Sequence, residues 1–65
     1  MDWDKLKSFY EIALARSISK ASVKLNISQS ALSRQIQDLE FDLKTPLFIR
    51  HQKGVRLTEQ GENLF

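Results

Sequence analysis

The sequence predicts a small, mainly helical domain that continues into a β-hairpin and the start of a further helix. Three observations lead to this fold class. Apolar residues recur at helical spacing over roughly the first two-thirds of the 65 residues. Serines stand directly before two of the helical segments, where a hydroxyl can cap the backbone. The single proline and both glycines come after residue 45, so the strongest helix breakers are confined to the last third.

Composition limits the size of the core and the classes of function that the chain can have. Hydrophobic residues make up 42% and charged residues 28%, as in an ordinary globular domain, and 65 residues allow only one small core. The chain has no cysteine, which excludes disulfides, thiolate zinc sites and thiol nucleophiles. No apolar run approaches the roughly 20 residues that span a membrane, and the acidic N-terminus lacks a signal-peptide pattern. We therefore expect a cytoplasmic protein with no membrane partner.

Two helices are expected in the first 26 residues. The first runs from about Trp3 to Ala15, with Asp2 as its N-cap. Ser17 or Ser19 can cap a second, short helix, and Asn26 suits the turn after it because asparagine tolerates a left-handed backbone. The apolar face of the first helix has members spaced three and four residues apart: Trp3, Leu6, Phe9, Tyr10, Ala13 and Leu14.

Ser28 is expected to cap a third helix, over residues 29–43. It should end before Pro46, because the residue preceding a proline avoids the helical region. A capped helix, a short turn and another capped helix form the layout of a helix-turn-helix. The third helix has one apolar stripe for the core, which consists of Leu32, Ile36, Leu39 and Leu43.

The last third of the chain has a different pattern. Residues 47–50 and 55–57 are β-prone, and residues 52–54 between them include a glycine, so we expect a hairpin. Thr58 then caps a fourth helix, inside which the chain stops. The complete fold class is mainly α: a three-helix winged helix-turn-helix with a two-stranded β-hairpin wing and the start of a fourth helix. We expect residues 1–58 to form this domain and residues 59–65 to begin a further helix of a longer protein.

The net charge of +2 is distributed unevenly. Residues 16–37 and 44–56 carry only basic charges, and an acidic block separates them. Such an arrangement predicts one positive face that attracts a polyanion. On charge alone, a solvated surface without a partner is an equally good interpretation. The basic residues are Arg16, Lys20, Lys24, Arg34, Lys44, Arg50, Lys53 and Arg56, and the acidic block is Asp38, Glu40 and Asp42.

The third helix carries a second, polar face in its first half. At about 100° per residue its members fall within an arc of about 140°. Arginine can bind guanine, glutamine can bind adenine, and serine accepts several bases, so we predict that this face reads double-stranded DNA. The alternative is an ordinary exposed helix on which Arg34 pairs with Asp38 four residues later. The predicted base-reading residues are Gln29, Ser30, Ser33, Arg34 and Gln37.

Contacts to the DNA backbone are predicted mainly at the hairpin. Lys53 at its tip and Arg50 in its first strand suit phosphates or the minor groove. The alternative is a solvated ribbon whose charges only prevent strand pairing with other chains. The role of Arg56 stays open. The other predicted backbone contacts lie at the starts of the second and third helices: Ser19, Lys20 and Ser28.

Two other function classes are alternatives to DNA binding. An enzymatic function has few candidate catalytic residues, because His51 is the only histidine and the sequence has no phosphate-binding loop or nucleophile motif. We predict no catalytic residue, metal or cofactor. A helical protein-interaction module without DNA binding is the stronger rival, since exposed aromatic residues could form a docking patch: Trp3, Tyr10, Phe41 and Phe65.

From Leu6 to Leu64 the chain resembles the N-terminal domain of LysR-type transcription regulators. The resemblance implies binding to promoter DNA as a homodimer or tetramer, a linker helix from near Thr58, and an absent C-terminal domain that binds a small-molecule effector. It also implies that Gln29, Ser30, Ser33 and Arg34 face the major groove and that Lys53 approaches the minor groove or its phosphates. The matching segments are residues 17–21, 27–36, 39–40, 43, 46–48, 50, 55–58 and 61.

The sequence departs from this family's usual pattern at three positions. Ser30 stands where proline is usual, which gives up a preset φ and adds a hydroxyl near the bases. Ser22 replaces an alanine, and its hydroxyl is expected to bond back to the preceding turn. Lys44 stands where glycine usually ends the third helix, so a left-handed Lys44 would carry about 1 kcal/mol of strain.

Overall fold

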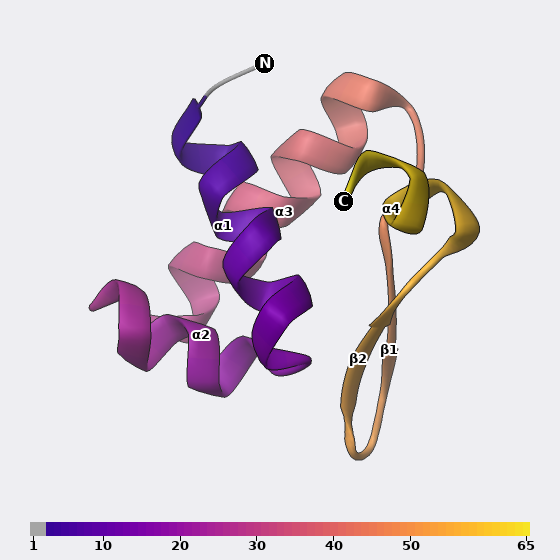
Figure 1. Ribbon diagram of the computed structural model, residues 1–65. Helices are drawn as coiled ribbons and strands as arrows, with labels where there is room; N and C mark the ends of the chain where they lie inside the picture. The colour runs from indigo at the N-terminus through magenta and orange to yellow at the C-terminus, as the bar shows by residue number, and fades with distance from the viewer. Residues whose placement is uncertain (1–2) are drawn as a thin grey trace.

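The computed structural model describes residues 3–65. Three helices precede an antiparallel hairpin and a short fourth helix, which confirms the expected fold class (Figure 1). Asp2, the predicted first cap, lies outside the described residues. The elements are α1 (Trp3–Ala15), α2 (Ile18–Leu25), α3 (Gln29–Leu43), β1 (Phe48–His51), β2 (Gly54–Leu57) and α4 (Glu59–Leu64).

Hydroxyl caps begin three of the helices. The Ser17 Oγ accepts the Lys20 N–H at 3.1 Å, so Ser17 caps α2, and Ser19 lies inside that helix. Ser28 caps α3 in the same way, by accepting the N–H of residue 31 at 3.1 Å. Thr58 caps α4. Each such cap contributes on the order of 1 kcal/mol, and all three come from local sequence signals.

Left-handed residues end the first three helices. Asn26 and Lys44 have φ values of 58° and 54°, and their N–H groups return to carbonyls of the last helical turn. The sequence predicted this conformation for Asn26 and left it conditional for Lys44. It was not predicted for Arg16, yet its φ is 56°. The structure gives the reason, because the Arg16 carbonyl accepts the N–H of Val55 from the hairpin at 3.2 Å.

The core lies between α1, α2, α3 and the base of the hairpin. The stripe of α3 contributes Leu32, Ile36 and Leu39, all buried, while Leu43 is half-buried against the same cluster. Phe48 of β1 packs against Phe9 of α1, with ring centroids 5.3 Å apart. Burial of each large apolar side chain contributes about 1.5–3 kcal/mol. The buried apolar residues are Phe9, Ile12, Ala21, Leu32, Ile36, Leu39, Leu47 and Val55.

The hairpin differs slightly from the expected one. β1 pairs with β2 from Phe48 opposite Leu57 to His51 opposite Gly54, so the turn has two residues and Gly54 belongs to a strand. Its φ is 140°, and a Cβ there would lie 2.5 Å from the Arg16 carbonyl oxygen. Glycine is therefore required by the close approach of the hairpin to the α1–α2 turn. The β-prone pattern alone does not show this approach.

The end of the chain folds back onto the body. The Thr58 N–H donates to the Leu47 carbonyl at 2.9 Å, which joins the start of α4 to the start of the hairpin. Phe65 stacks on Tyr10 of α1 with a centroid distance of 5.3 Å. Among residues 3–65, none of the helices has both the length and the apolar character needed to cross a bilayer.

Candidate nucleic-acid interface

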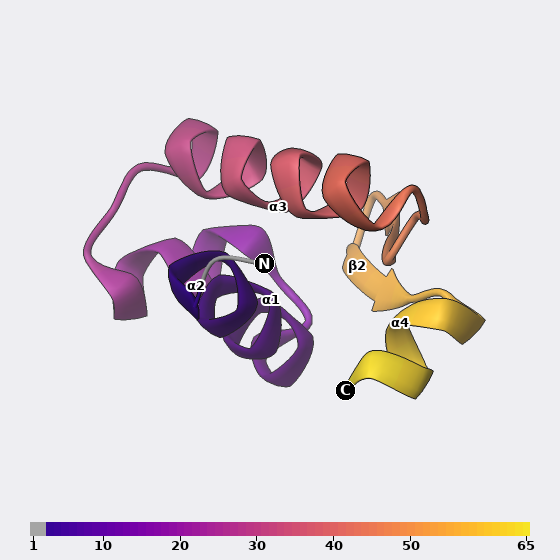
Figure 2. The same cartoon turned by 90° about the horizontal axis from the view of Figure 1, so that it is seen from above.

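One long side of α3 is left uncovered by the rest of the molecule. Figure 2 shows α1 and α2 together on one side of this helix, with no element on the other. The polar face predicted from the sequence lies on α3 in its first nine residues. Its members are Gln29, Ser30, Arg34 and Gln37, which are exposed, and Ser33, which is half-buried.

Most of this face has no partner within the protein. Among residues 3–65, the side chains of Gln29, Ser33, Arg34 and Gln37 make no hydrogen bond or ion pair. The expected alternative for Arg34 is not observed, because the Asp38 carboxylate lies 3.9 Å from the ammonium of Lys5 instead. The donors and acceptors of the face are thus available to a ligand.

Ser30 is the exception on this face. Its Oγ lies 3.3 Å from the Oγ of Ser28, the residue that caps α3. The serine that replaces the family's usual proline is therefore joined to the helix cap. Its hydroxyl is held at the start of α3, where the exposed polar face begins.

The remaining polar residues of α3 and α2 hold these helices on α1. The Ser8 hydroxyl donates to the Gln35 amide oxygen, which joins α1 to the middle of α3. The Lys24 ammonium lies 3.1 Å from the carboxylate of Glu11, which is 9% exposed, and joins α2 to α1. Both contacts orient the helix-turn-helix on its support, and neither occupies the outward face of α3.

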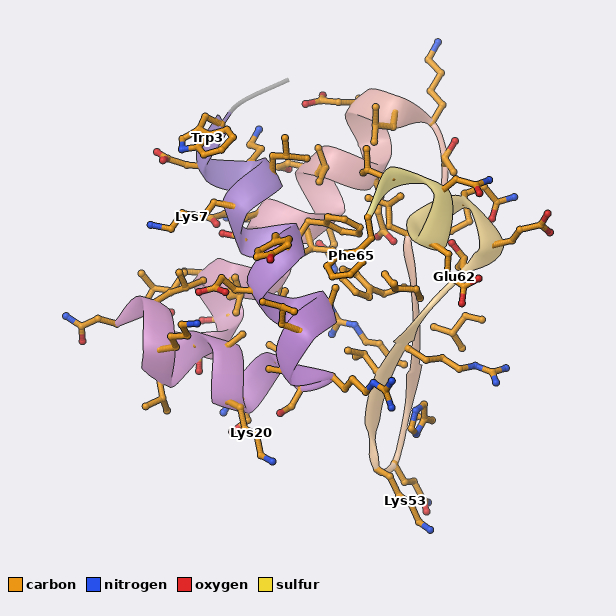
Figure 3. All side chains as sticks on the ribbon, viewed as in Figure 1. Trp3, Lys7, Lys20, Lys53, Glu62 and Phe65 are labelled. Carbon is orange, nitrogen blue, oxygen red and sulfur yellow. The ribbon has the colours of Figure 1, made fainter. Side chains whose placement is uncertain are left out.

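Three of the predicted backbone contacts share one groove. A hollow of about 340 Å³ lies between the start of α2 and the hairpin, and Ser19, Arg50 and Lys53 contribute to its lining. Lys20 lies at the same end of the molecule as Lys53 (Figure 3). Ser28 is separate from this group, since it caps α3.

The strand register places the two arginines of the hairpin on opposite faces of the ribbon. Arg50 is opposite Val55, so both side chains leave the same face of the ribbon, and Val55 is buried in the core. Arg56 is opposite Ile49 and shares the other face. It lines a different groove, of about 660 Å³, to which Glu59, Glu62 and Lys53 also contribute. Arg50 is thus turned toward the start of α2, whereas Arg56 shares its groove with acids and with the lysine at the hairpin tip.

Sequence reasoning missed one residue near this interface. In the sequence, Glu40 belongs to the acidic block and to a segment that resembles the family, without a predicted role, but its Oε2 accepts the N–H of Leu47 at 2.6 Å and of Phe48 at 3.2 Å. A weak signal existed, because an acid in the last turn of a helix is unfavourable beside the helix dipole. Nothing in the sequence spacing identifies its two partners across the loop.

The model of the bacterial regulatory helix-turn-helix proteins of the lysR family matches residues 3–62. The chain belongs to the LysR family. Among curated relatives, the transcriptional activator IlvY of Salmonella typhimurium is 47% identical over 64 residues, and the regulator GltR of Bacillus subtilis is 45% identical over 64 residues. Each match covers 98% of this chain and 22% of the relative, so the chain spans about a fifth of these proteins.

Solved structures of the LysR family have the same fold. The DNA-binding domain of CbnR in complex with DNA matches with a TM-score of 0.94 and 36% identity, over 97% of this chain and 72% of that one. The DNA-binding domain of BenM in complex with catB site 1 DNA also has a TM-score of 0.94, with 38% identity over 98% of this chain and 71% of that one. Both of these domains were crystallised on DNA.

Proposed function

We propose that this chain is the sequence-specific DNA-binding domain of a LysR-type transcription regulator. In this proposal α3 enters the major groove, and the wing, defined as residues 47–57, lies on the minor groove or the phosphates. The observation that carries the proposal is the uncovered face of α3, whose donors and acceptors are mostly without a partner inside the protein. The DNA complexes of the CbnR and BenM domains support it.

Each side chain of the face has a role that its chemistry suits. Arg34 can donate two hydrogen bonds to a guanine, and Gln29 and Gln37 can each bind an adenine. Ser30 and Ser33 can donate to or accept from several bases, so they add less selectivity. All five lie in the first half of α3, which is the part that meets the bases in helix-turn-helix proteins.

The backbone contacts provide affinity and fix the register on the duplex. Arg50 and Lys53 approach phosphates from the wing, and Ser19 and Lys20 approach them from the start of α2. Ser28 offers the start of α3 to a further phosphate. Each cation that neutralises a phosphate releases a counterion, so we expect binding to weaken as salt increases.

The larger protein is part of the same proposal. Residues 1–58 would be the winged helix-turn-helix and residues 59–65 the start of a linker helix that pairs two subunits. A homodimer or tetramer would act on promoter DNA in the cytoplasm and respond to a small-molecule effector through a C-terminal domain. The chain itself would have no catalytic activity.

Selection of bound sequences from a random duplex pool, at two salt concentrations, tests the DNA proposal. We expect enrichment of a specific motif, and a log–log dependence of affinity on salt with a slope near −0.9 for each phosphate contact. Equal retention of all sequences with no salt dependence would overturn the proposal.

A protein-interaction role has one supporting feature. An apolar groove of about 490 Å³ runs between α1 and the end of the chain. Phe41 is not part of it, although it is 81% exposed, so the four aromatic residues do not form one patch. Apolar docking would barely respond to salt, which separates it from DNA binding in the same experiment. The groove is lined by Trp3, Leu6, Lys7, Phe9, Tyr10, Leu64 and Phe65.

A further inference from the structure

The wing is joined to α3 through a single side chain. Glu40 lies in the last turn of α3, and its Oε2 accepts the N–H of Leu47 at 2.6 Å and of Phe48 at 3.2 Å. Within the part of the chain that the structure describes, no other hydrogen bond or ion pair connects α3 to residues 47–57. The carboxylate of Glu40 therefore adds a polar contact from α3 to a wing whose first residues also pack in the core.

Leu47, whose N–H donates to Glu40, also contacts the start of α4. Leu47 is 1% exposed, so water cannot readily replace the carboxylate as acceptor for its N–H. The Leu47 carbonyl accepts the Thr58 N–H at 2.9 Å, and it also lies where a Cβ on Gly61 would be only 2.3 Å away. A shift of Leu47 would consequently move both the wing and the start of α4.

We propose that Glu40 is a positioning residue for DNA recognition. It holds the wing so that the backbone contact of Lys53 and the base contacts of α3 form on the same duplex. This inference rests on the proposed function. Glu40 acts through Leu47 and Phe48 and makes no contact with DNA itself. Its carboxylate is directed at two backbone N–H groups, which offsets part of the repulsion that an acid on α3 exerts on phosphates.

Glu40→Gln gives a test in which position and charge predict opposite results. The substitution keeps the size of the side chain and removes its negative charge. One amide oxygen can still accept both N–H groups, but without the charge that makes hydrogen bonds to a carboxylate about twice as strong. Loss of charge alone would strengthen DNA binding. A weaker hold on the start of the wing should lower affinity, and we expect a decrease of at least about twofold. Unchanged or tighter binding would overturn the proposal.

Asp38→Asn is the matched control. Asp38 lies on the same helix and is 54% exposed in its side chain, and among residues 3–65 its only ion pair is with the Lys5 ammonium at 3.9 Å. It has no hydrogen bond to the wing, so this variant should bind DNA equally or slightly more tightly. If Asp38→Asn weakened binding as much as Glu40→Gln, a general loss of stability would be the cause and the proposal would fail.

A double-mutant cycle with Lys53→Ala tests whether Glu40 acts through the wing. If it does, Lys53→Ala should reduce affinity by a smaller factor in the Glu40→Gln background than in the unaltered chain, with a coupling of at least about twofold. Factors that simply multiply would contradict the proposal. Penalties for base changes under Arg34 should stay the same in Glu40→Gln.

Amide hydrogen exchange separates this inference from the function on which it rests. The amides of Leu47 and Phe48 should be protected in the unaltered chain and exchange faster in Glu40→Gln, while amides of α1 stay protected. If the unaltered chain failed to bind any DNA, the proposed function would fall. Unchanged protection of both amides in Glu40→Gln would instead show that Glu40 does not hold the wing.

Discussion

The two halves of α3 differ in what their side chains touch. In residues 29–37, the outward polar side chains have almost no partner inside the protein. In residues 38–43, the acids have partners: Lys5 lies 3.9 Å from both Asp38 and Asp42, and Glu40 holds the wing. The apolar stripe runs through both halves, so the same packing supports them.

This difference shows how one helix can combine two tasks. An exposed polar group costs nothing while water solvates it, so the first half can keep its donors free for an external ligand. The second half uses its polar groups to orient the wing and to contact α1. Substitutions should therefore separate into those that change binding and those that change folding, according to the half and face in which they fall.

Leu39→Ala should have the largest effect, which should be a decrease in the free energy of unfolding. Leu39 is fully buried, and removal of its side chain leaves a cavity that typically costs about 2–5 kcal/mol of unfolding free energy. Gln37→Ala, two residues earlier on the exposed face, should stay within about 0.5 kcal/mol. Urea denaturation followed by circular dichroism measures both. Equal losses would remove the distinction between the core stripe and the outward face.

Arg34→Ala should mainly affect binding. Because the guanidinium has no partner among residues 3–65, its removal should leave the unfolding free energy nearly unchanged. Affinity for the selected operator should fall by about 1–3 kcal/mol, and base preference at one position should relax. Titration against operators that differ at single base pairs provides the measurement. Equal weakening of all sequences would make Arg34 a phosphate contact.

The contrast within α3 also explains which structural features could be predicted from the sequence. Ser17, Ser28 and Thr58 cap helices by contacts within three residues, so local reasoning identified them, apart from the choice between Ser17 and Ser19. The stripe of α3 follows from periodicity alone. The outward face was identified for the same reason, because it is the complement of that stripe.

Contacts across loops could not be identified in this way. Glu40 meets Leu47 only because a left-handed Lys44 turns the chain back beside its own helix. Gly54 is required by the Arg16 carbonyl, which lies 38 positions earlier in the sequence. Asp38 looked like a partner for Arg34 at helical spacing, but Lys5 of α1 lies closer to it in space. Each of these contacts depends on how the elements pack, which no single segment encodes.

Lys53→Ala extends the comparison to the wing. Its effect should be smaller than that of Arg34→Ala, nearly the same for every DNA sequence, and accompanied by a decrease of about 1 in the salt slope. Affinities at several salt concentrations give this slope. Arg56→Ala is the matched control, since it removes a cation from β2 of the same hairpin, on the face opposite Arg50 and in a groove that Glu59 and Glu62 also line. A similar slope change for both variants would contradict the assignment of the hairpin tip, and not Arg56, to DNA.

Lys44→Gly should have the smallest effect and the opposite sign. Lys44 ends α3 with a φ of 54°, a conformation that favours glycine, so the substitution should stabilise the fold by about 0.5–1 kcal/mol. Asn26→Gly is a control at an equivalent helix end, and it should gain less because asparagine tolerates this conformation. Thermal unfolding of both variants measures the difference. Because Lys44 lies beyond the base-reading half, operator preference should not change, and a changed preference would place the end of α3 in contact with bases.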